Sequence, residues 1–283
     1  MILSYHPLFE ADKNITCAGR EPGEADLKAI KAADAVILPQ GCYQSLFEMS
    51  RANCPHVFPD YYIRFKYPGK LGQIKLFREF NIAHPASEIF SNLAAFHPYF
   101  RELFSASSMN YPFVFKFDWG GEGETVFLIN SEEELRTILQ KTAEFEKTGQ
   151  YGFLLQEYIS SRNRTLRVAI IGQRLISYWR IQKQENNSGF YTNLGKGAVI
   201  DAESEPGLQD KAVALVKQIC HKTSINLAGF DVIFSSDTDN PEPRLLEINY
   251  FFGRKGLGGS EAYYRILLGE IQTWLAGLGL VDS

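Results

Sequence analysis

Cysteine and histidine are scarce in this chain, and neither falls into a pattern typical of zinc binding or nucleophilic catalysis. The four cysteines are scattered without a CxxC pair, which argues against a zinc site or a disulfide framework and favours reduced thiols. The five histidines are also scattered, and no serine, cysteine or histidine lies in a recognisable nucleophile motif. Positive charge is limited too: the net charge of −4 gives no basic field, so we expect no nucleic-acid partner and no anionic membrane.

Long apolar runs and low-complexity tracts are missing as well. No apolar run is long enough to span a bilayer, and the first residues, MILSYHPLFE, have neither a basic nor an apolar signal-peptide region. We therefore expect a cytoplasmic protein. The composition, 45% hydrophobic and 22% charged, is that of a folded chain, and 283 residues can bury a substantial core.

The chain changes character along its length. Residues 1 to about 68 alternate strand-like and helical patterns, which predicts a small α/β unit. The apolar stripe of Leu71, Ile74 and Phe77 then predicts an amphipathic helix. From Pro112 onward we expect strands at FVFKF, TVFLI and FLLQEYI, a hairpin of LRVAII and RLISYWRI, and two more strands at GFDVIF and RLLEIN. We expect helices at SEEELRTILQKTAEFEK, LQDKAVALVKQICHKT and EAYYRILLGEIQTWL. The first of these helices begins with a capping box formed by Ser131 and Glu134.

Three oxygen-bearing side chains lie on the last two predicted strands. Because strand side chains alternate, Glu247 and Asn249 point to one face, while Leu246 and Ile248 point to the other. The turn-rich SSDTDNPEP segment favours antiparallel pairing, which brings Asp231 onto the same face. Burying unpaired carboxylates there costs free energy, and a bound Mg²⁺ that also holds a nucleotide would offset this cost. The alternative is that Asp231 caps a turn and that Glu247 and Asn249 are exposed to solvent. The apolar residues that flank them argue against this alternative.

A lysine and a glycine-rich loop are adjacent in the FVFKF–DWGGEGE segment. Lys116 sits in the strand, and Gly120, Gly121 and Gly123 follow it. Glycines let the backbone approach phosphate oxygens, and the lysine supplies a point charge. The segment matches neither a P-loop nor a dinucleotide fingerprint. By itself it is better explained as a tight hairpin turn with a surface lysine.

Arginines lie on both arms of the predicted hairpin. Arg167 and Arg180 could hold carboxylates or phosphates in bidentate fashion, or form ordinary cross-strand charge on an exposed face. For Arg162, Arg164 and Arg174 the second interpretation is favoured.

The order of these features resembles the ATP-grasp superfamily, in the branch of the ribosomal-protein glutamate ligases and glutathione synthetase, over roughly residues 70–255. The resemblance implies an α/β fold with two lobes gripping ATP, formed by residues 71–283. These follow the N-terminal unit of residues 1–70, with a lid lobe at about 111–158 and a metal-binding lobe at about 159–283.

The resemblance also implies roles for individual residues. Lys70, with Lys75 as the weaker alternative, and Lys116 would contact nucleotide phosphates under the glycine-rich loop. The other residues that it implies for the nucleotide are the adenine-reading linker Gln156, Glu157, Tyr158 and Ile159, and Asn193 and Lys196 of TNLGKG near the phosphates. Arg167 and Arg180 would steady the transferred phosphate and the acyl intermediate. Asp231, Glu247 and Asn249 would hold Mg²⁺, or Mn²⁺ in its place.

Three features depart from the family pattern. Thr165 stands where an aspartate is usual, which bears on substrate contacts. Glu122 and Glu124 put negative charge into a phosphate-covering loop, which is unfavourable unless they turn outward. The segment YFFGRKGLGG replaces a short Pro-Gly turn, and its Arg254 and Lys255 either bind an acidic substrate or are surface charges.

The function implied is an ATP-dependent, ADP-forming ligase that joins a small carboxylate to an amine or thiol through an acyl phosphate. A homodimer is the expected assembly. Two alternatives stay open: a small-molecule kinase on the same fold, for which no general base is identifiable, and a non-catalytic nucleotide-binding regulatory protein.

Overall fold

Three β-sheets form the frame of the protein in the computed structural model, which describes residues 1–100, 110–121, 123–182 and 197–282. The N-terminal sheet is parallel, with the strand order β2-β1-β3-β4. Its elements are β1 (Ile2–Ser4), β2 (Lys13–Asn14), α1 (Glu24–Lys31), β3 (Ala35–Ile37), α2 (Gln44–Asn53) and β4 (His56–Phe58). Helices cross over between parallel strands here, as the predicted alternation requires.

Two helices lead from this unit to the rest of the chain, α3 (Tyr62–Lys66) and α4 (Gly69–Glu79). In α4 the side chains of Ile74 and Phe77 are buried in the largest apolar cluster, and Leu71 packs against it. The predicted amphipathic helix is therefore confirmed, with its apolar stripe facing the core.

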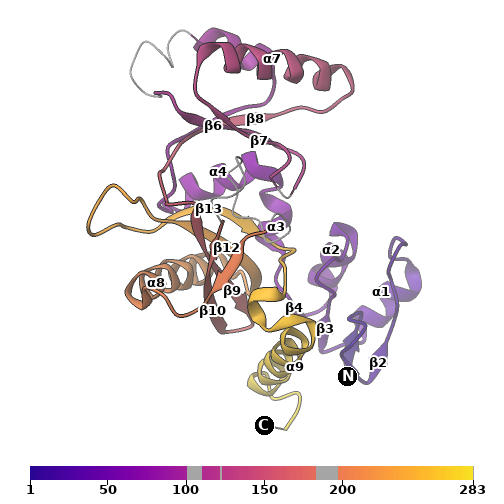
Figure 1. The fold of residues 1–283 in the computed structure, drawn as a ribbon. Coiled ribbons are helices and arrows are strands. Elements are labelled where there is room, and N and C mark those ends of the chain that lie inside the picture. The colour runs from indigo at the N-terminus through magenta and orange to yellow at the C-terminus, as the bar shows by residue number, and fades with distance from the viewer. Residues whose placement is uncertain (101–109, 122, 183–196, 283) are drawn as a thin grey trace.

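The second sheet is antiparallel, with the order β5-β8-β6-β7. Its segment contains β5 (Ser87–Phe90), α5 (Leu93–Phe96), η1 (His97–Tyr99), β6 (Phe113–Phe117), β7 (Val126–Ile129), α7 (Glu132–Lys147) and β8 (Phe153–Glu157). Helix α7 lies over this sheet at the top of Figure 1. Because β5 pairs with β8, the sheet begins before residue 111, where the sequence placed the start of the lid lobe.

The predicted capping box of α7 forms with one change. Ser131 accepts a hydrogen bond from the Glu134 N–H at 3.2 Å, as expected of an N-cap. The Glu134 carboxylate, however, accepts from the N–H of Asn130 at 2.7 Å, one residue before the cap.

The third sheet has five antiparallel strands in the order β11-β10-β9-β12-β13. Its segment contains β9 (Arg164–Ile171), β10 (Arg174–Ile181), β11 (Val199–Asp201), α8 (Pro206–Thr223), β12 (Leu227–Ile233), β13 (Arg244–Asn249), η3 (Lys255–Leu257) and α9 (Gly259–Gly277). The β9–β10 hairpin and the antiparallel β12–β13 pair are as predicted.

Alternation along β9 explains how this sheet carries both a core and a polar surface. Leu166, Val168 and Ile170 pack with α4 and α8 in one cluster. Ala169 and Ile171, on the opposite face, pack with α9. Arg167 continues that second face beyond the end of the α9 cluster, so the same face turns from apolar to charged along the strand.

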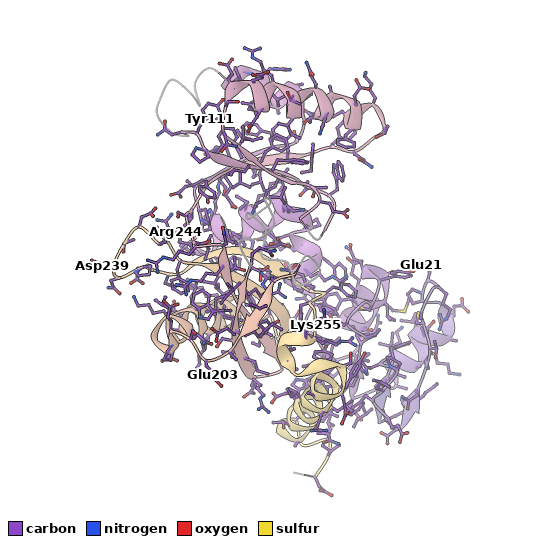
Figure 2. All side chains as sticks on the ribbon, in the orientation of Figure 1. Glu21, Tyr111, Glu203, Asp239, Arg244 and Lys255 are labelled. Atoms are coloured by element: carbon purple, nitrogen blue, oxygen red, sulfur yellow. The ribbon has the colours of Figure 1, made fainter. Side chains whose placement is uncertain are left out.

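Two loops of the third segment differ in their surroundings. Asp239, in the exposed β12–β13 turn, projects outward in Figure 2, whereas Lys255 lies between the five-stranded sheet and the N-terminal unit. Within the described ranges, no helix combines the length and the apolarity needed to cross a membrane.

Candidate functional site

A cavity of about 600 Å³ lies between the β5-β8-β6-β7 sheet and the five-stranded sheet. Every predicted site residue within the described part of the chain lines it: Lys70, Lys116, Gly120, Gly121, Gly123, Gln156, Glu157, Tyr158, Ile159, Arg167, Arg180, Asp231, Glu247 and Asn249. Asn193 and Lys196 lie outside the described residues, as does Glu122. A cavity of this size is typical of a small-molecule or cofactor site.

Lys116 faces the cavity because of its place in β6. Phe113, Phe115 and Phe117 point into the aromatic cluster under α7, so the alternate residues Val114 and Lys116 point the other way. Burial of the Lys116 amine lowers its pKa to about 8, although the nearby Glu247 carboxylate acts in the opposite direction.

Lys70 approaches the cavity from the first turn of α4. Its amine donates hydrogen bonds to the carbonyl oxygens of Trp119 at 3.3 Å and Gly120 at 3.1 Å, and burial lowers its pKa. Lys75, the weaker alternative, is exposed and does not line the cavity. Helix and glycine-rich loop are also joined by Asp118, whose carboxylate accepts from the Leu71 N–H at 2.8 Å.

The glycine-rich loop lines the cavity, and two of its glycines, Gly120 and Gly123, have positive φ values that other residues rarely adopt. Gly120 has φ of +80°, and a Cβ there would lie 2.4 Å from Cγ2 of Thr125. Thr125 is itself fixed, since its hydroxyl donates to the Trp119 carbonyl oxygen at 2.8 Å. Glu124 is exposed, which satisfies the condition that this acid turns outward.

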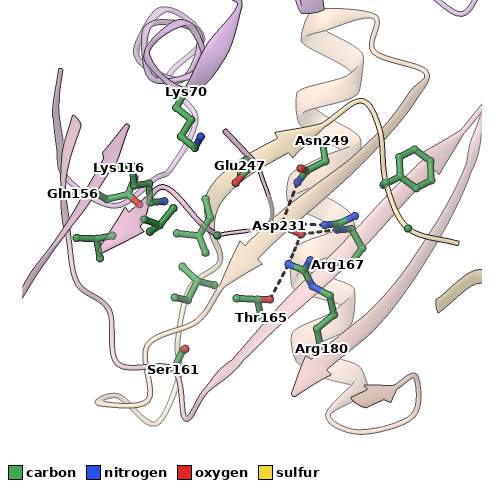
Figure 3. Close-up of a pocket in the computed structure, with 18 of the residues that line it drawn as sticks. Lys70, Lys116, Gln156, Ser161, Thr165, Arg167, Arg180, Asp231, Glu247 and Asn249 are labelled. Atoms are coloured by element: carbon green, nitrogen blue, oxygen red, sulfur yellow. Dashed lines mark hydrogen bonds and ion pairs between the residues drawn. The ribbon is translucent and has the colours of Figure 1, made fainter. Parts of the chain in front are cut away.

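Asp231, Glu247 and Asn249 come together on one face of the β12–β13 pair (Figure 3). Asp231 is directly opposite Glu247 in the strand register. The Asn249 side-chain nitrogen donates to Asp231 Oδ2 at 3.1 Å. The expected convergence of these three side chains is therefore present.

One expectation for β13 is wrong. Leu246 lines the cavity next to Glu247 instead of facing the core, while Leu245 and Ile248 are buried in the core. The cause is a β-bulge: Asp231 pairs with Glu247 but Val232 pairs with Leu245, so Leu246 has no partner and the alternation is interrupted.

Asp231 is also the partner of both arginines (Figure 3). Arg167 Nε and Nη2 lie 2.5 and 3.1 Å from the two carboxylate oxygens, and Arg180 Nη2 lies 2.7 Å from Oδ1. Burial disfavours the charged form of Asp231, yet the two guanidinium groups outweigh it and hold its pKa below the usual range. Arg180 Nη2 also donates to the Thr165 hydroxyl at 3.0 Å, which explains the role of a threonine here.

The donor set fits a hard cation. Asp231 and Glu247 supply carboxylate oxygens and Asn249 an amide oxygen, and Mg²⁺ prefers such ligands while keeping places for water and phosphate. Burial and the neighbouring Asp231 charge raise the pKa of Glu247, a repulsion that a cation would relieve. The described residues include no group of three or more His, Cys, Asp or Glu side chains placed to hold a metal.

The end of β8 and the residues that follow it form the opposite wall. Gln156 is buried, and its amide donates to the Ser87 hydroxyl at 2.9 Å. The Glu157 carboxylate is held by Arg244 at 2.9 Å and by the Ala86 N–H at 3.1 Å. Both side chains are therefore held by protein groups. The apolar side chains on this wall and across from it are Val114, Ile159, Ile233 and Leu246.

Gln73 is a residue of this region that the sequence analysis did not single out. Its side-chain amide donates to the Ile248 carbonyl oxygen and accepts from the Ile248 N–H, both at 2.8 Å. Ile248 lies between Glu247 and Asn249 on the edge strand of the sheet. Its spacing from Lys70 could have indicated it, because residues three apart in a helix lie on the same face.

Comparison with known families identifies the fold that carries this cavity. Residues 70–267 match the sequence model of the RimK-like ATP-grasp domain. The chain belongs to the RimK-like ATP-grasp family. The resemblance inferred from the order of the motifs is thereby confirmed.

Individual relatives are distant. An uncharacterized protein of Mycoplasma pneumoniae, the MG012 homolog, is 28% identical over 129 residues, which is 45% of this chain and 40% of the relative. This chain therefore matches less than half of that relative.

Solved structures share the fold at low sequence identity. The ADP complex of an N5-carboxyaminoimidazole ribonucleotide synthetase superposes with a TM-score of 0.60 and 14% identity, over 90% of this chain and 64% of that one. D-alanine–D-alanine ligase from Bacillus anthracis gives a TM-score of 0.60 and 14% identity, over 93% and 86%.

Proposed function

We propose that the protein is an ATP-dependent ligase that forms ADP and joins a small carboxylate to an amine or thiol through an acyl phosphate. The observation that carries this proposal is the single cavity in which two lysines, two arginines and the Asp231–Glu247–Asn249 oxygens face one another. Phosphoryl transfer requires positioning and charge neutralisation more than covalent help from the protein. Two of the proteins with a similar fold are a synthetase solved with ADP and a ligase.

In the proposed first step, a carboxylate oxygen of the substrate attacks the γ-phosphorus of ATP. The bond from that phosphorus to the β,γ-bridging oxygen breaks, and ADP leaves with the electron pair. Lys70 and Lys116 neutralise phosphate charge, and the Gly120 loop covers the phosphates and excludes water. Arg180 and Arg167 exchange part of their contact with Asp231 for the transferred group.

In the second step, the amine or thiol attacks the acyl carbon, inorganic phosphate leaves, and the attacking group loses a proton. Asp231, Glu247 and Asn249 would hold Mg²⁺, which supplies charge neutralisation at the phosphate oxygens. Thr165 positions Arg180 for this chemistry through the 3.0 Å hydrogen bond.

We further propose a division of labour among the parts of the chain. Residues 1–70 border the substrate end of the cavity, the lid lobe covers the nucleotide, and the metal-binding lobe carries the arginines and the oxygen donors. The contacts of the Tyr250–Gly259 segment with the N-terminal unit support this arrangement.

Hydroxamate formation tests the proposed reaction. The protein is incubated with Mg-ATP, hydroxylamine and a pool of amino acids and small carboxylic acids, while ADP release is followed in parallel. We expect hydroxamate and ADP in equal amounts, because hydroxylamine captures an acyl phosphate whatever the natural amine is. Glu247→Ala should lose both products.

Glu242→Ala is the matched control. Glu242 is an exposed carboxylate in the β12–β13 turn, paired with Lys211 outside the cavity, so its removal should leave turnover unchanged. ADP without hydroxamate would contradict the ligase and indicate a kinase. Binding of ATP with neither product would indicate a regulatory nucleotide-binding protein.

A further inference from the structure

The cavity extends away from the lysines toward a loop that joins β13 to α9. This loop, residues 250–259, meets the carboxyl end of β3 in the N-terminal sheet. The Gln40 amide donates to the Tyr250 carbonyl oxygen at 2.9 Å, and the Tyr263 hydroxyl donates to Gln40 Oε1 at 3.3 Å. A Cβ on Gly41 would lie 2.8 Å from the ring of Phe251. The N-terminal unit therefore supports the loop that forms this end of the cavity.

Two cations of the loop, Arg254 and Lys255, line the cavity at this end. The Arg254 guanidinium lies 4.8 Å from the Tyr263 ring centroid and 4.5 Å from that of Tyr264. Neither Arg254 nor Lys255 forms an ion pair with any acid of the described segments. Both residues therefore line the cavity without a carboxylate partner among the described residues.

The acids that line the cavity are already matched elsewhere. Asp231 pairs with Arg167 and Arg180. Glu157 pairs with Arg244. Glu247 lies in the field of Lys116 and Lys70. The positive charge at the loop end therefore has no counter-charge among the described lining residues.

The loop also holds Arg254 in place. Its carbonyl oxygen accepts hydrogen bonds from the N–H groups of Leu257 at 2.9 Å and Gly259 at 3.0 Å. Gly256 packs so closely against Tyr178 that a Cβ there would lie 2.1 Å from the ring. These contacts fix the backbone at Arg254, and the two tyrosine rings pack against its guanidinium, so little conformational entropy is lost when an anion binds.

The remaining groups around Arg254 do not neutralise it. Burial and the Arg254 charge lower the pKa of His6, which keeps that ring neutral. Its Nδ1 accepts from the Leu8 N–H at 3.3 Å. Phe251 is 63% exposed and adds an apolar surface to the cavity wall next to the two cations.

We propose that Arg254 and Lys255 bind an anionic group, a carboxylate or a phosphate, on the small-molecule substrate at a position remote from its reacting atom. The inference rests on the proposed function, since it names the substrate class of the same cavity. A guanidinium packed against two rings and an ammonium on the next residue suit either anion, and Phe251 offers an apolar face for the part of the molecule between its two ends.

The test measures binding of small probes to the intact chain saturated with Mg²⁺ and AMP-PNP, so that the nucleotide site is filled. Calorimetric titrations use succinate, inorganic phosphate and succinamide, the neutral isostere of succinate. We expect succinate, phosphate or both to bind at least about tenfold more tightly than succinamide, because a charge-assisted hydrogen bond is worth that much or more.

Two variants locate the anion. Arg254→Gln and Lys255→Gln should each weaken anion binding about tenfold, while the affinity for AMP-PNP stays within about twofold. Lys255 is exposed, so its variant keeps the test decisive if Arg254→Gln unfolds. Arg265→Gln removes an exposed arginine of α9 paired with Glu261 and serves as the matched control, with unchanged anion binding.

The outcomes separate this inference from the function on which it rests. Binding of succinate alone or of phosphate alone identifies the anion. Equal affinities for succinate, phosphate and succinamide, or anion affinities unchanged in both variants, would overturn the inference and leave the ligase intact. Failure of the unaltered chain to bind AMP-PNP would overturn the proposed function, and the inference with it.

Discussion

At the scale of single residues, Lys116 is the clearest case of a side chain whose chemistry follows from its position. It lies in a strand whose other face is entirely aromatic, so its side chain points into the cavity, where it is half-buried. Burial costs the charged form free energy, and the pKa falls to about 8 in the ligand-free protein. Bound phosphates would stabilise the charged form and raise this pKa again.

The prediction is a pH dependence of ATP binding. Below pH 8 Lys116 is already charged, so this group adds no pH dependence. Above pH 8 the free protein has lost the proton and binding must take it up, so the association constant should fall by up to about tenfold per pH unit. Calorimetry between pH 7 and 9.5, in two buffers of different ionisation enthalpy, measures both the affinity and the proton uptake.

Lys116→Met should bind ATP more weakly at every pH and show neither the decline nor the proton uptake. Lys75→Met, which removes an exposed lysine of α4, should keep the wild-type profile. A profile of the Lys116→Met variant that still declines above pH 8 would assign the titration to another group.

At the scale of elements, the edge strand β13 depends on a neighbour outside the sheet. Its inner side pairs with β12, while Gln73 of α4 satisfies both backbone groups of Ile248 on the outer side. Helix α4 also carries Lys70 into the cavity. One helix therefore fixes a lysine and the strand that holds Glu247 and Asn249.

We predict that Gln73→Leu lowers the free energy of unfolding by about 1–3 kcal/mol, because the Ile248 N–H and C=O lose their partners. It should also raise the Mg²⁺ concentration needed for half-maximal ATP binding, since the two oxygen donors beside Ile248 lose their support. Urea denaturation measures the first effect and Mg²⁺ titration the second.

Lys75→Gln, on the exposed face of the same helix, should change stability by less than about 0.5 kcal/mol. A destabilised Gln73→Leu variant with unchanged Mg²⁺ dependence would restrict Gln73 to a structural role.

Local sequence patterns predicted the longer helices and strands after Pro112 and the faces of most of these strands, because alternation and turn residues act over a few positions, but they did not predict the short strands β5 and β11. They failed at Leu246, since a bulge depends on how β12 and β13 pair and not on β13 alone. The contact of Arg167 with Asp231 could not be predicted either, because it follows from β9 and β12 being neighbours in the sheet. Motif order along the chain indicated the family, while the cavity and its charge pairs required the structure.

At the scale of the whole molecule, the apolar clusters show which parts depend on one another. The β5-β8-β6-β7 sheet and α7 enclose their own cluster, which includes Phe96, Phe115 and Phe153. The N-terminal unit has a cluster of its own, which includes Leu3 and Phe47, but it also shares a second cluster with α9 and β9, to which it contributes Ile2 and Phe58, among others. Figure 1 shows α9 next to the N-terminal strands. We therefore expect the N-terminal unit and α9 to unfold together.

Phe58→Ala tests this dependence. Phe58 is 1% exposed and lies 5.6 Å from Trp274 of α9 between ring centroids, so its removal should cost about 3–5 kcal/mol. Hydrogen exchange should then accelerate in β1, β3 and α9 together. Phe96→Ala, an equally buried phenylalanine of the other cluster, should accelerate exchange in β6, β8 and α7 and leave α9 protected. Acceleration of β1 and β3 alone in Phe58→Ala would show that the N-terminal unit opens independently. Joint opening would mean that the Arg254 loop, which lies between these two parts, keeps its geometry only while both are folded.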